Sequence, residues 1–275
     1  REALSMDAAR LENLAADFTS QSPLNHVCIE LSGEELTLFD RPLLGYACAG
    51  DPLFEAFLAP GVIGPHYRPP QAWLETAQTV VSFFLPFSQA VRAQNRAAQS
   101  LPSQAWLYGR VEGQRFVEAL SLRLLQALQE AGFEAVAPSL SSDFWTVSEP
   151  ETPDGPAFTS NWSERHAAYA CGLGTFGLSK GLITRRGMAG RFGSLVTSWQ
   201  TPPTPREYDG LYDWCIRCGA CATRCPGGAI SLEQGKNHHL CLSYQTTILP
   251  QCRPRFGCGL CQTGVPCESA RPLSR

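Results

Sequence analysis

The sequence has 275 residues, of which 44% are apolar and 17% are charged, so it encodes a globular protein and not a disordered one. Its formal net charge of −3 argues against the strongly basic surface that binds nucleic acid. A chain of this length can form one large core, or one core and a smaller second domain. The longest apolar run, Thr79–Phe87, is too short to cross a bilayer. Because no secretory signal peptide opens the sequence, we expect a cytoplasmic protein without membrane contact.

Apolar periodicity predicts the elements of residues 1–200. Helical spacing indicates an amphipathic helix over residues 4–18 and a long helix over Trp106–Ala131, which Gly132 ends. The continuous apolar run Thr79–Leu85 predicts a central strand that is covered on both faces. Further strands are expected at Glu134–Leu140, Gly181–Thr184 and Phe192–Thr197.

A further helix is expected from Asn161, which suits the N-cap position, to the closing Gly172. Glu164 follows three residues after Asn161, as in a capping box. The stiff linker Thr201–Pro205 is the expected domain boundary, so we predict one domain over residues 1–200 and another over 206–275.

Cysteines are concentrated near the C-terminus, where nine of the twelve lie between Cys215 and Cys267. A disulfide scaffold would spread its cysteines along a short secreted chain. This distribution instead predicts one small region of cysteine chemistry. The remaining three are expected to be small buried core residues, namely Cys28, Cys48 and Cys171.

The first cysteine group has the spacing C-x2-C-x2-C-x3-C-P, formed by Cys215, Cys218, Cys221, Cys225 and a following proline. Bacterial two-cluster ferredoxins use this run to bind [4Fe–4S] clusters, and its fourth cysteine ligates the other cluster. A structural zinc site is the alternative, but zinc usually takes two separated pairs of ligands. The spacing therefore predicts an iron–sulfur module.

A second group supplies five more cysteines, and two cubane clusters need eight thiolates in all. We expect Cys252 to be the spare, although an exchange of roles between Cys252 and Cys241 stays open. One cluster is assigned to Cys215, Cys218, Cys221 and Cys267. The other cluster is assigned to Cys225, Cys241, Cys258 and Cys261.

The segment Gly172–Gly177 spells G-x-G-x-x-G, the fingerprint of dinucleotide-binding folds. That fingerprint needs a strand before it, a helix after it and an acid about 20 residues further on. Here a helix is expected before it and a strand after it, and Thr197 stands in the place of the acid. We therefore expect these glycines to allow close backbone approach and not to bind a dinucleotide.

The segment Ser160–Thr197, together with the cysteine run after it, resembles the epoxyqueuosine reductase family and, more distantly, the corrinoid reductive dehalogenases. The resemblance is carried by Glu164-Arg165, the glycine segment, Leu182-Ile183, Gly187 and Leu195–Thr197. The pieces Cys241–Tyr244 and Gly257–Gln262 also look like that family's second cysteine group.

The resemblance implies an α/β (α+β) fold, with a nitroreductase-like three-layer catalytic domain followed by a two-cluster ferredoxin-like domain. It further implies a bound cobalamin, with a flavin in the same fold as the alternative. An external ferredoxin or flavodoxin would supply low-potential electrons, and the protein would place the cofactor against its substrate. The implied cofactor contacts are Arg165, Gly174, Thr175, Phe176, Gly177, Gly193, Ser194 and Thr197.

The sequence departs from that family at the proton donor, because Phe158 stands where the family has an acid. Asp154, His166 and Tyr169 could replace that acid, although a structural role is the simpler reading of the last two. The sequence lacks a counterpart of the helical-repeat extension of tRNA-acting members, and its net charge is −3. We therefore expect a small-molecule substrate and consider tRNA unlikely. The alternative is a non-catalytic electron carrier, or a reductive activator of a partner corrinoid protein.

Overall fold

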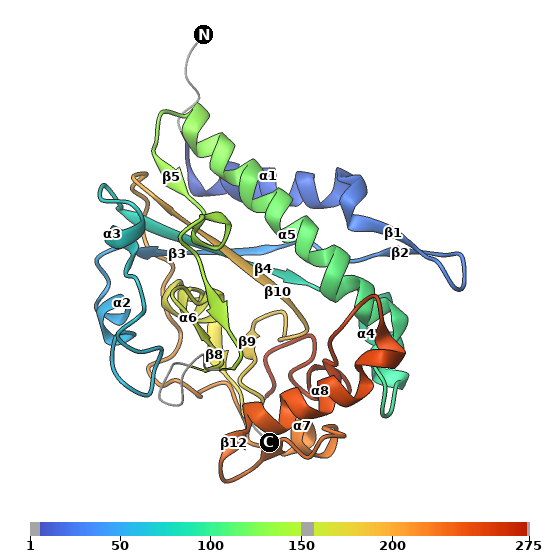
Figure 1. The fold of residues 1–275 in the computed structure, drawn as a ribbon. Coiled ribbons are helices and arrows are strands. Elements are labelled where there is room, and N and C mark those ends of the chain that lie inside the picture. The colour runs from blue at the N-terminus through green and yellow to red at the C-terminus, as the bar shows by residue number, and fades with distance from the viewer. Residues whose placement is uncertain (1–5, 150–156, 274–275) are drawn as a thin grey trace.

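The computed structural model describes residues 6–149 and 157–273. Its strands are β1 (His26–Ile29), β2 (Glu34–Thr37), β3 (Leu43–Cys48), β4 (Thr79–Pro86), β5 (Ala135–Val136), β6 (Thr146–Val147), β7 (Thr159–Ser160), β8 (Gly174–Phe176), β9 (Leu182–Thr184), β10 (Gly190–Thr197), β11 (Ile230–Ser231) and β12 (Gly235–Lys236). Its helices are α1 (Ala8–Gln21), α2 (Pro52–Ala56), α3 (Pro70–Trp73), α4 (Gln89–Ala97), α5 (Gln104–Glu130), α6 (Glu164–Ala170), α7 (Ala220–Thr223) and α8 (His238–Cys252). In Figure 1 the cysteine-rich segment, drawn in orange and red, lies at one end of the molecule beside α4.

The central sheet consists of β3, β4, β10 and β5 in that order, and each neighbouring pair is antiparallel. β4 is buried along its whole length, as its apolar run predicts. Its side chains alternate between two cores: Val80 and Phe84 belong to one, and Val81 and Phe83 to the other. The sheet is therefore covered on both faces.

One face of the sheet is covered by α5 and α1 (Figure 1). α5 contributes one apolar side chain every fourth residue, at Phe116, Leu120, Leu124 and Leu128, and all four are fully buried. The long helix expected from this spacing is confirmed, with Gly132 in the left-handed region just beyond its end. Burial of each such side chain contributes about 1.5–3 kcal/mol.

The other face is covered by α6, whose start differs from the expected one. α6 begins at Glu164 after Ser163, and Asn161 does not cap it. The Asn161 side chain instead accepts a hydrogen bond from Trp145 N at 3.0 Å and donates one to the Asp143 carbonyl at 2.8 Å. Because Asn161 is used to fix that neighbouring segment, no capping box forms and the Glu164 carboxylate is free for another role.

One expected strand is shorter than predicted. Only Ala135–Val136 of the segment 134–140 pairs with β10, because a 3-10 turn over Pro138–Leu140 follows directly. The strand expected at Gly181–Thr184 is present as β9 and pairs with β8. Gly174 faces β9 so closely that a Cβ there would lie 1.9 Å from the Ile183 carbonyl oxygen, which confirms close backbone approach as the need for glycine.

The three isolated cysteines are not alike. Cys171 is fully buried, and its Sγ lies 3.3 Å from the Val80 carbonyl oxygen. Cys28 and Cys48 are exposed, contrary to expectation, because they point to the outer face of β1 and the end of β3. Within the described residues, no helix is long and apolar enough to cross a membrane.

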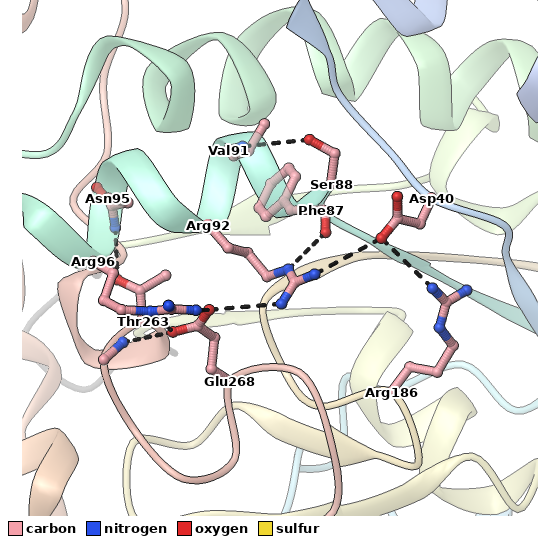
Figure 2. A network of polar contacts seen from close by, with 11 residues as sticks. Asp40, Phe87, Ser88, Val91, Arg92, Asn95, Arg96, Arg186, Thr263 and Glu268 are labelled. Atoms are coloured by element: carbon pink, nitrogen blue, oxygen red, sulfur yellow. Dashed lines mark hydrogen bonds and ion pairs between the residues drawn. The ribbon is translucent and has the colours of Figure 1, made fainter.

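The cysteine-rich segment is fixed to α4 by polar contacts, and Figure 2 shows those of Asn95 with Thr263 and of Arg96 with Glu268. Asn95, which is fully buried in α4, donates to Thr263 Oγ1 at 3.0 Å. Arg224 donates to the carbonyl oxygens of Asn95 and Thr263, each at 3.1 Å. Glu268 joins the same network through Arg96. The cysteine-rich segment is thereby held against α4 through Arg224, Thr263 and Glu268.

Candidate functional site

Eight of the nine C-terminal cysteines form two sets of four that line different cavities. Cys225, Cys241, Cys258 and Cys261 line a cavity of about 700 Å³, which we call the large cavity. The second set lines a smaller cavity and consists of Cys215, Cys218, Cys221 and Cys267. Cys252 lines neither cavity and is buried with Leu107 and Ile248. This grouping equals the one expected for two clusters, and iron binding by each set stays a prediction.

The backbone around the cysteines suits cluster binding. Gly219 adopts the left-handed conformation before α7, so the chain turns between Cys218 and Cys221. Ala229 N donates to Cys225 Sγ at 3.3 Å, and Gln245 Nε2 donates to Cys241 Sγ at 3.4 Å. Hydrogen bonds to cluster sulfurs raise the reduction potential and orient the ligands. Burial raises the pKa of Cys258 to about 11 and of Cys261 to about 12, so metal binding there must displace protons.

The wall opposite these cysteines carries Glu164 at the first position of α6. Ser194 Oγ donates to Glu164 Oε2 at 2.6 Å, and Trp162 Nε1 donates to Ser194 Oγ at 2.9 Å. Glu164 Oε1 is buried and has no hydrogen-bond partner among the described residues. Burial raises the pKa of Glu164 to about 7, against the opposing hydrogen bond from Ser194. Glu164 can therefore hold or release a proton near neutral pH.

The expected cofactor contacts lie mostly behind this wall, and of them only Arg165 lines the large cavity. Thr175 Oγ1 accepts a hydrogen bond from Trp214 N, and Thr197 Oγ1 donates to the Glu134 carbonyl. Gly193 leaves room for the Phe83 ring. The others also serve packing: Gly174 and Phe176 form β8, Ser194 supports Glu164, and Gly177 lines the smaller cavity. Contact of this strand and the glycine segment with a cofactor therefore stays a prediction, and of the expected residues only Arg165 lines the large cavity.

Two of the expected proton donors, His166 and Tyr169, do not line the large cavity either. The His166 ring packs between Phe57 and Phe176, and burial lowers its pKa to about 4, so it is neutral at pH 7. Tyr169 is buried against Phe176 and Tyr208. Asp154 lies outside the described residues.

Phe158, at the position of the family's acid, packs against the rings of His238 and His239. Its φ of 51° lies in the left-handed region, which is rare for a bulky residue. The pKa of His238 is lowered to about 4, chiefly by burial. An aromatic cluster therefore occupies this position next to the start of α8.

Glu164 was expected as part of a capping box, and its place in the lining of the large cavity was not predicted. The Glu164-Arg165 pair, recognised in the resemblance, is the signal that could have found it. Both members of that pair line the large cavity.

Comparisons with known proteins concern the first cysteine run and the overall fold. A model of the 4Fe-4S binding domain matches residues 211–231, which contain the first cysteine run. Curated protein sequences gave no match. Epoxyqueuosine reductase from Streptococcus thermophilus is similar in structure, with a TM-score of 0.52, 17% identity, and coverage of 84% of this chain and 64% of that one.

Two further solved structures show the same likeness. An epoxyqueuosine reductase with a modified tRNA stem loop has a TM-score of 0.52 and 15% identity, over 97% of this chain and 68% of that one. A catabolic reductive dehalogenase with 3-bromo-4-hydroxybenzoic acid has a TM-score of 0.55 and 15% identity, over 84% of this chain and 30% of that one. This chain thus spans about two thirds or less of the length of these relatives.

The domain match defines a 4Fe–4S binding domain at residues 211–231, and the overall fold is similar to that of an epoxyqueuosine reductase. The particular fold is the one shared by epoxyqueuosine reductases and reductive dehalogenases, which confirms the resemblance predicted from the sequence.

Proposed function

We propose that this protein is an iron–sulfur oxidoreductase that carries low-potential electrons through two [4Fe–4S] clusters to a cofactor in the large cavity, where a small molecule is reduced. The observation that carries the proposal is the shared cavity. Four cysteines of one set and the proton-holding Glu164 line the same space of about 700 Å³.

Cluster order follows from exposure. Cys218 of the first set is exposed, so this set suits an outer cluster that meets an external ferredoxin or flavodoxin. The second set opens to the large cavity and suits an inner cluster. We propose, in addition, that residues 1–200 form a nitroreductase-like domain and 206–275 a ferredoxin-like domain in a cytoplasmic protein.

A corrinoid is the cofactor that the sequence resemblance favours, with a flavin as the alternative. The large cavity fits such a group, because it joins the inner cysteines to a polar wall on which Glu164 Oε1 has no partner among the described residues. A corrinoid would supply a nucleophilic, low-potential metal centre. Arg165 and the aromatic Trp162 and Phe192 would hold it, and Glu164 would keep a proton at Oε1 or Oε2 for the reduced substrate.

A second candidate function is a non-catalytic electron carrier or a reductive activator of a partner corrinoid protein. Phe158, in place of the acid, favours this reading. Glu164 favours the enzyme, because it supplies an acid from another position on the same wall.

One experiment separates these functions. The protein is isolated without oxygen, and iron, cobalt and flavin per chain are measured before and after addition of cobalamin. About eight irons with a bound corrinoid or flavin would support the enzyme, since each cubane holds four irons. Iron without affinity for either cofactor would refute the enzyme and support the carrier. Zinc without iron would refute both.

A further inference from the structure

Three arginines from different elements line the large cavity: Arg110 of α5, Arg165 of α6 and Arg191 of β10. Arg165 donates to the Lys180 carbonyl at 2.7 Å, and Arg191 donates to Gln114 Oε1. Arg110 lies over the Phe256 ring, 5.3 Å from its centroid. In residues 6–149 and 157–273, none of the three forms an ion pair with a carboxylate.

The three guanidinium groups also repel one another. Burial lowers the pKa of all three, and the charge of Arg110 lowers the pKa of the other two further. Burial, with the charges of Arg110 and Arg165, brings the pKa of Arg191 down to about 9. Arg110 and Arg191 are partly buried, whereas Arg165 is exposed. Partly buried like charges such as Arg110 and Arg191 are unfavourable unless an anion compensates them, so this wall is poised for an anionic ligand.

The acids of the cavity offset the charge of the arginines only in part, since the charge of Glu118 raises the pKa of Arg191 but burial and the other arginines lower it. Glu118 accepts a hydrogen bond from Gln114 at 3.2 Å, and Gln114 lies between it and Arg191. Glu164 has a pKa of about 7 and is only partly charged at neutral pH. Lys236 adds another cation to the lining. An inner cluster with four thiolates would offset part of this charge, since Cys261 raises the pKa of Arg165.

We propose that Arg110, Arg165 and Arg191 form an anion-binding subsite that takes the carboxylate or phosphate group of a small ligand in the large cavity. Guanidinium groups match both anions by paired hydrogen bonds. Anion binding at this subsite does not depend on the proposed function. Only the identity of the ligand rests on it: the anionic group belongs either to the substrate or to the phosphodiester in the nucleotide tail of a corrinoid.

The test uses benzoate as the probe and benzamide as its neutral counterpart, titrated by calorimetry into the protein isolated without oxygen. Benzoate is expected to bind at least tenfold more tightly than benzamide. Arg191→Gln should weaken benzoate binding at least tenfold and leave benzamide unchanged, because one charged hydrogen bond is worth about tenfold or more. Arg115→Gln is the matched control: Arg115 is an exposed arginine of α5 that does not line the cavity. Iron content and thermal unfolding show that each variant is folded.

Cobalamin and cobinamide, which lacks the phosphate and nucleotide, distinguish the two sources of the anion. If the arginines hold the tail phosphate, Arg191→Gln weakens cobalamin and not cobinamide, and benzoate competes with cobalamin. If they hold a substrate, benzoate also binds to the cobalamin-loaded protein.

Equal binding of benzoate and benzamide would overturn the subsite. The same holds if Arg191→Gln shifts the reduction potential of a cluster and leaves benzoate binding intact, because the arginines would then serve only the cluster. Iron binding without selective benzoate binding refutes the subsite alone. Selective benzoate binding to a protein that takes up no iron refutes the proposed function alone.

Discussion

The guanidinium of Arg96 in α4 lies 2.5 Å from the carboxylate of Glu268, the residue directly after Cys267 (Figure 2). The same carboxylate accepts hydrogen bonds from Arg96 Nε at 3.1 Å and from Gly264 N at 2.7 Å, and Arg92 lies 3.6 Å away. Its side chain is only 5% exposed. The loop that carries Cys267 is therefore anchored to α4 by the carboxylate of Glu268.

Replacement of that carboxylate should loosen the loop. We expect Glu268→Gln to lower the free energy of unfolding by about 2 kcal/mol, because the nearly buried carboxylate loses its charge and with it the charged hydrogen bonds to Arg96 and the ion pair with Arg92. For a chain of this size that corresponds to a fall in Tm of about 4–8 °C. Glu207→Gln is the control, because the Glu207–Arg185 pair is half exposed and contributes less than about 1 kcal/mol. Thermal unfolding measures both, and equal shifts would contradict the anchoring role.

Two cysteines of α8 give a matched pair for iron binding. Cys241→Ser should reduce iron from about eight to about four per chain, because it removes a ligand of the inner set. Cys252→Ser should leave iron unchanged, since Cys252 packs with Leu107 and Ile248. Iron analysis with electron paramagnetic resonance checks both variants. Iron loss in the Cys252 variant alone would reverse their roles.

The raised pKa of Glu164 makes folding depend on pH. An unfolded glutamate has a pKa of about 4.3, whereas burial raises that of Glu164 to about 7. Between these values the folded protein binds more protons than the unfolded chain, so its stability falls as pH rises from about 4.3 to about 7. Glu164→Gln should remove this part of the pH dependence. Ser194→Ala should move the loss of stability to higher pH, because it removes the hydrogen bond that favours the charged form of Glu164. A plot of Tm against pH for the three proteins is the test, and parallel curves would contradict it.

The same carboxyl group gives a prediction for activity. If Glu164 supplies the proton, turnover of the loaded enzyme should fall as pH rises above about 7. Glu164→Gln should reduce turnover by about 10²-fold or more at pH 6.5. A variant with full turnover and an unchanged pH profile would assign the proton to another group.

Gly174 should tolerate no side chain. A Cβ at this position would lie 1.9 Å from the Ile183 carbonyl oxygen, so Gly174→Ala should lower the free energy of unfolding by about 3 kcal/mol or more. Gly33→Ala is the control, because Gly33 also has a positive φ but has no atom within 4 Å of its Cβ position. It should cost only about 1–2 kcal/mol. Denaturant unfolding compares the two, and equal losses would assign the effect to backbone conformation alone.

Periodic signals were sufficient for the elements that define the sheet. The apolar run of β4 and the fourfold spacing along α5 correspond directly to burial, because one strand is enclosed and one helix face is covered. The cysteine spacing likewise separates two sets that line two cavities. Apolar spacing and cysteine spacing are local in sequence, and each reflects one physical requirement: burial of a strand or helix face for the first, and a set of neighbouring thiols for the second.

Contacts between distant segments could not be predicted in this way. Asn161 has the sequence of a helix cap, but a segment near Trp145 takes up its side chain and leaves Glu164 in the large cavity. The arginines of that cavity stand 55 and 26 residues apart, at Arg110, Arg165 and Arg191, and no local pattern connects them. Close backbone approach in the glycine segment was predicted correctly, but its partner in that approach, β9, was not, since glycines packed under a strand and glycines facing a ligand look the same in sequence.

The pairing of β4 with β10 has a consequence for biosynthesis. Pro86 pairs with Gly190, so the ribosome must add over 100 residues before this edge of β4 can be covered. At about 5–20 residues per second, the edge of this mostly apolar strand waits roughly 5–20 s for its partner. Pairing over such a separation is also slow to nucleate once both strands exist. We expect the nascent chain to be prone to aggregation in this interval, and soluble yield to rise when a chaperone is co-expressed or translation is slowed by cold.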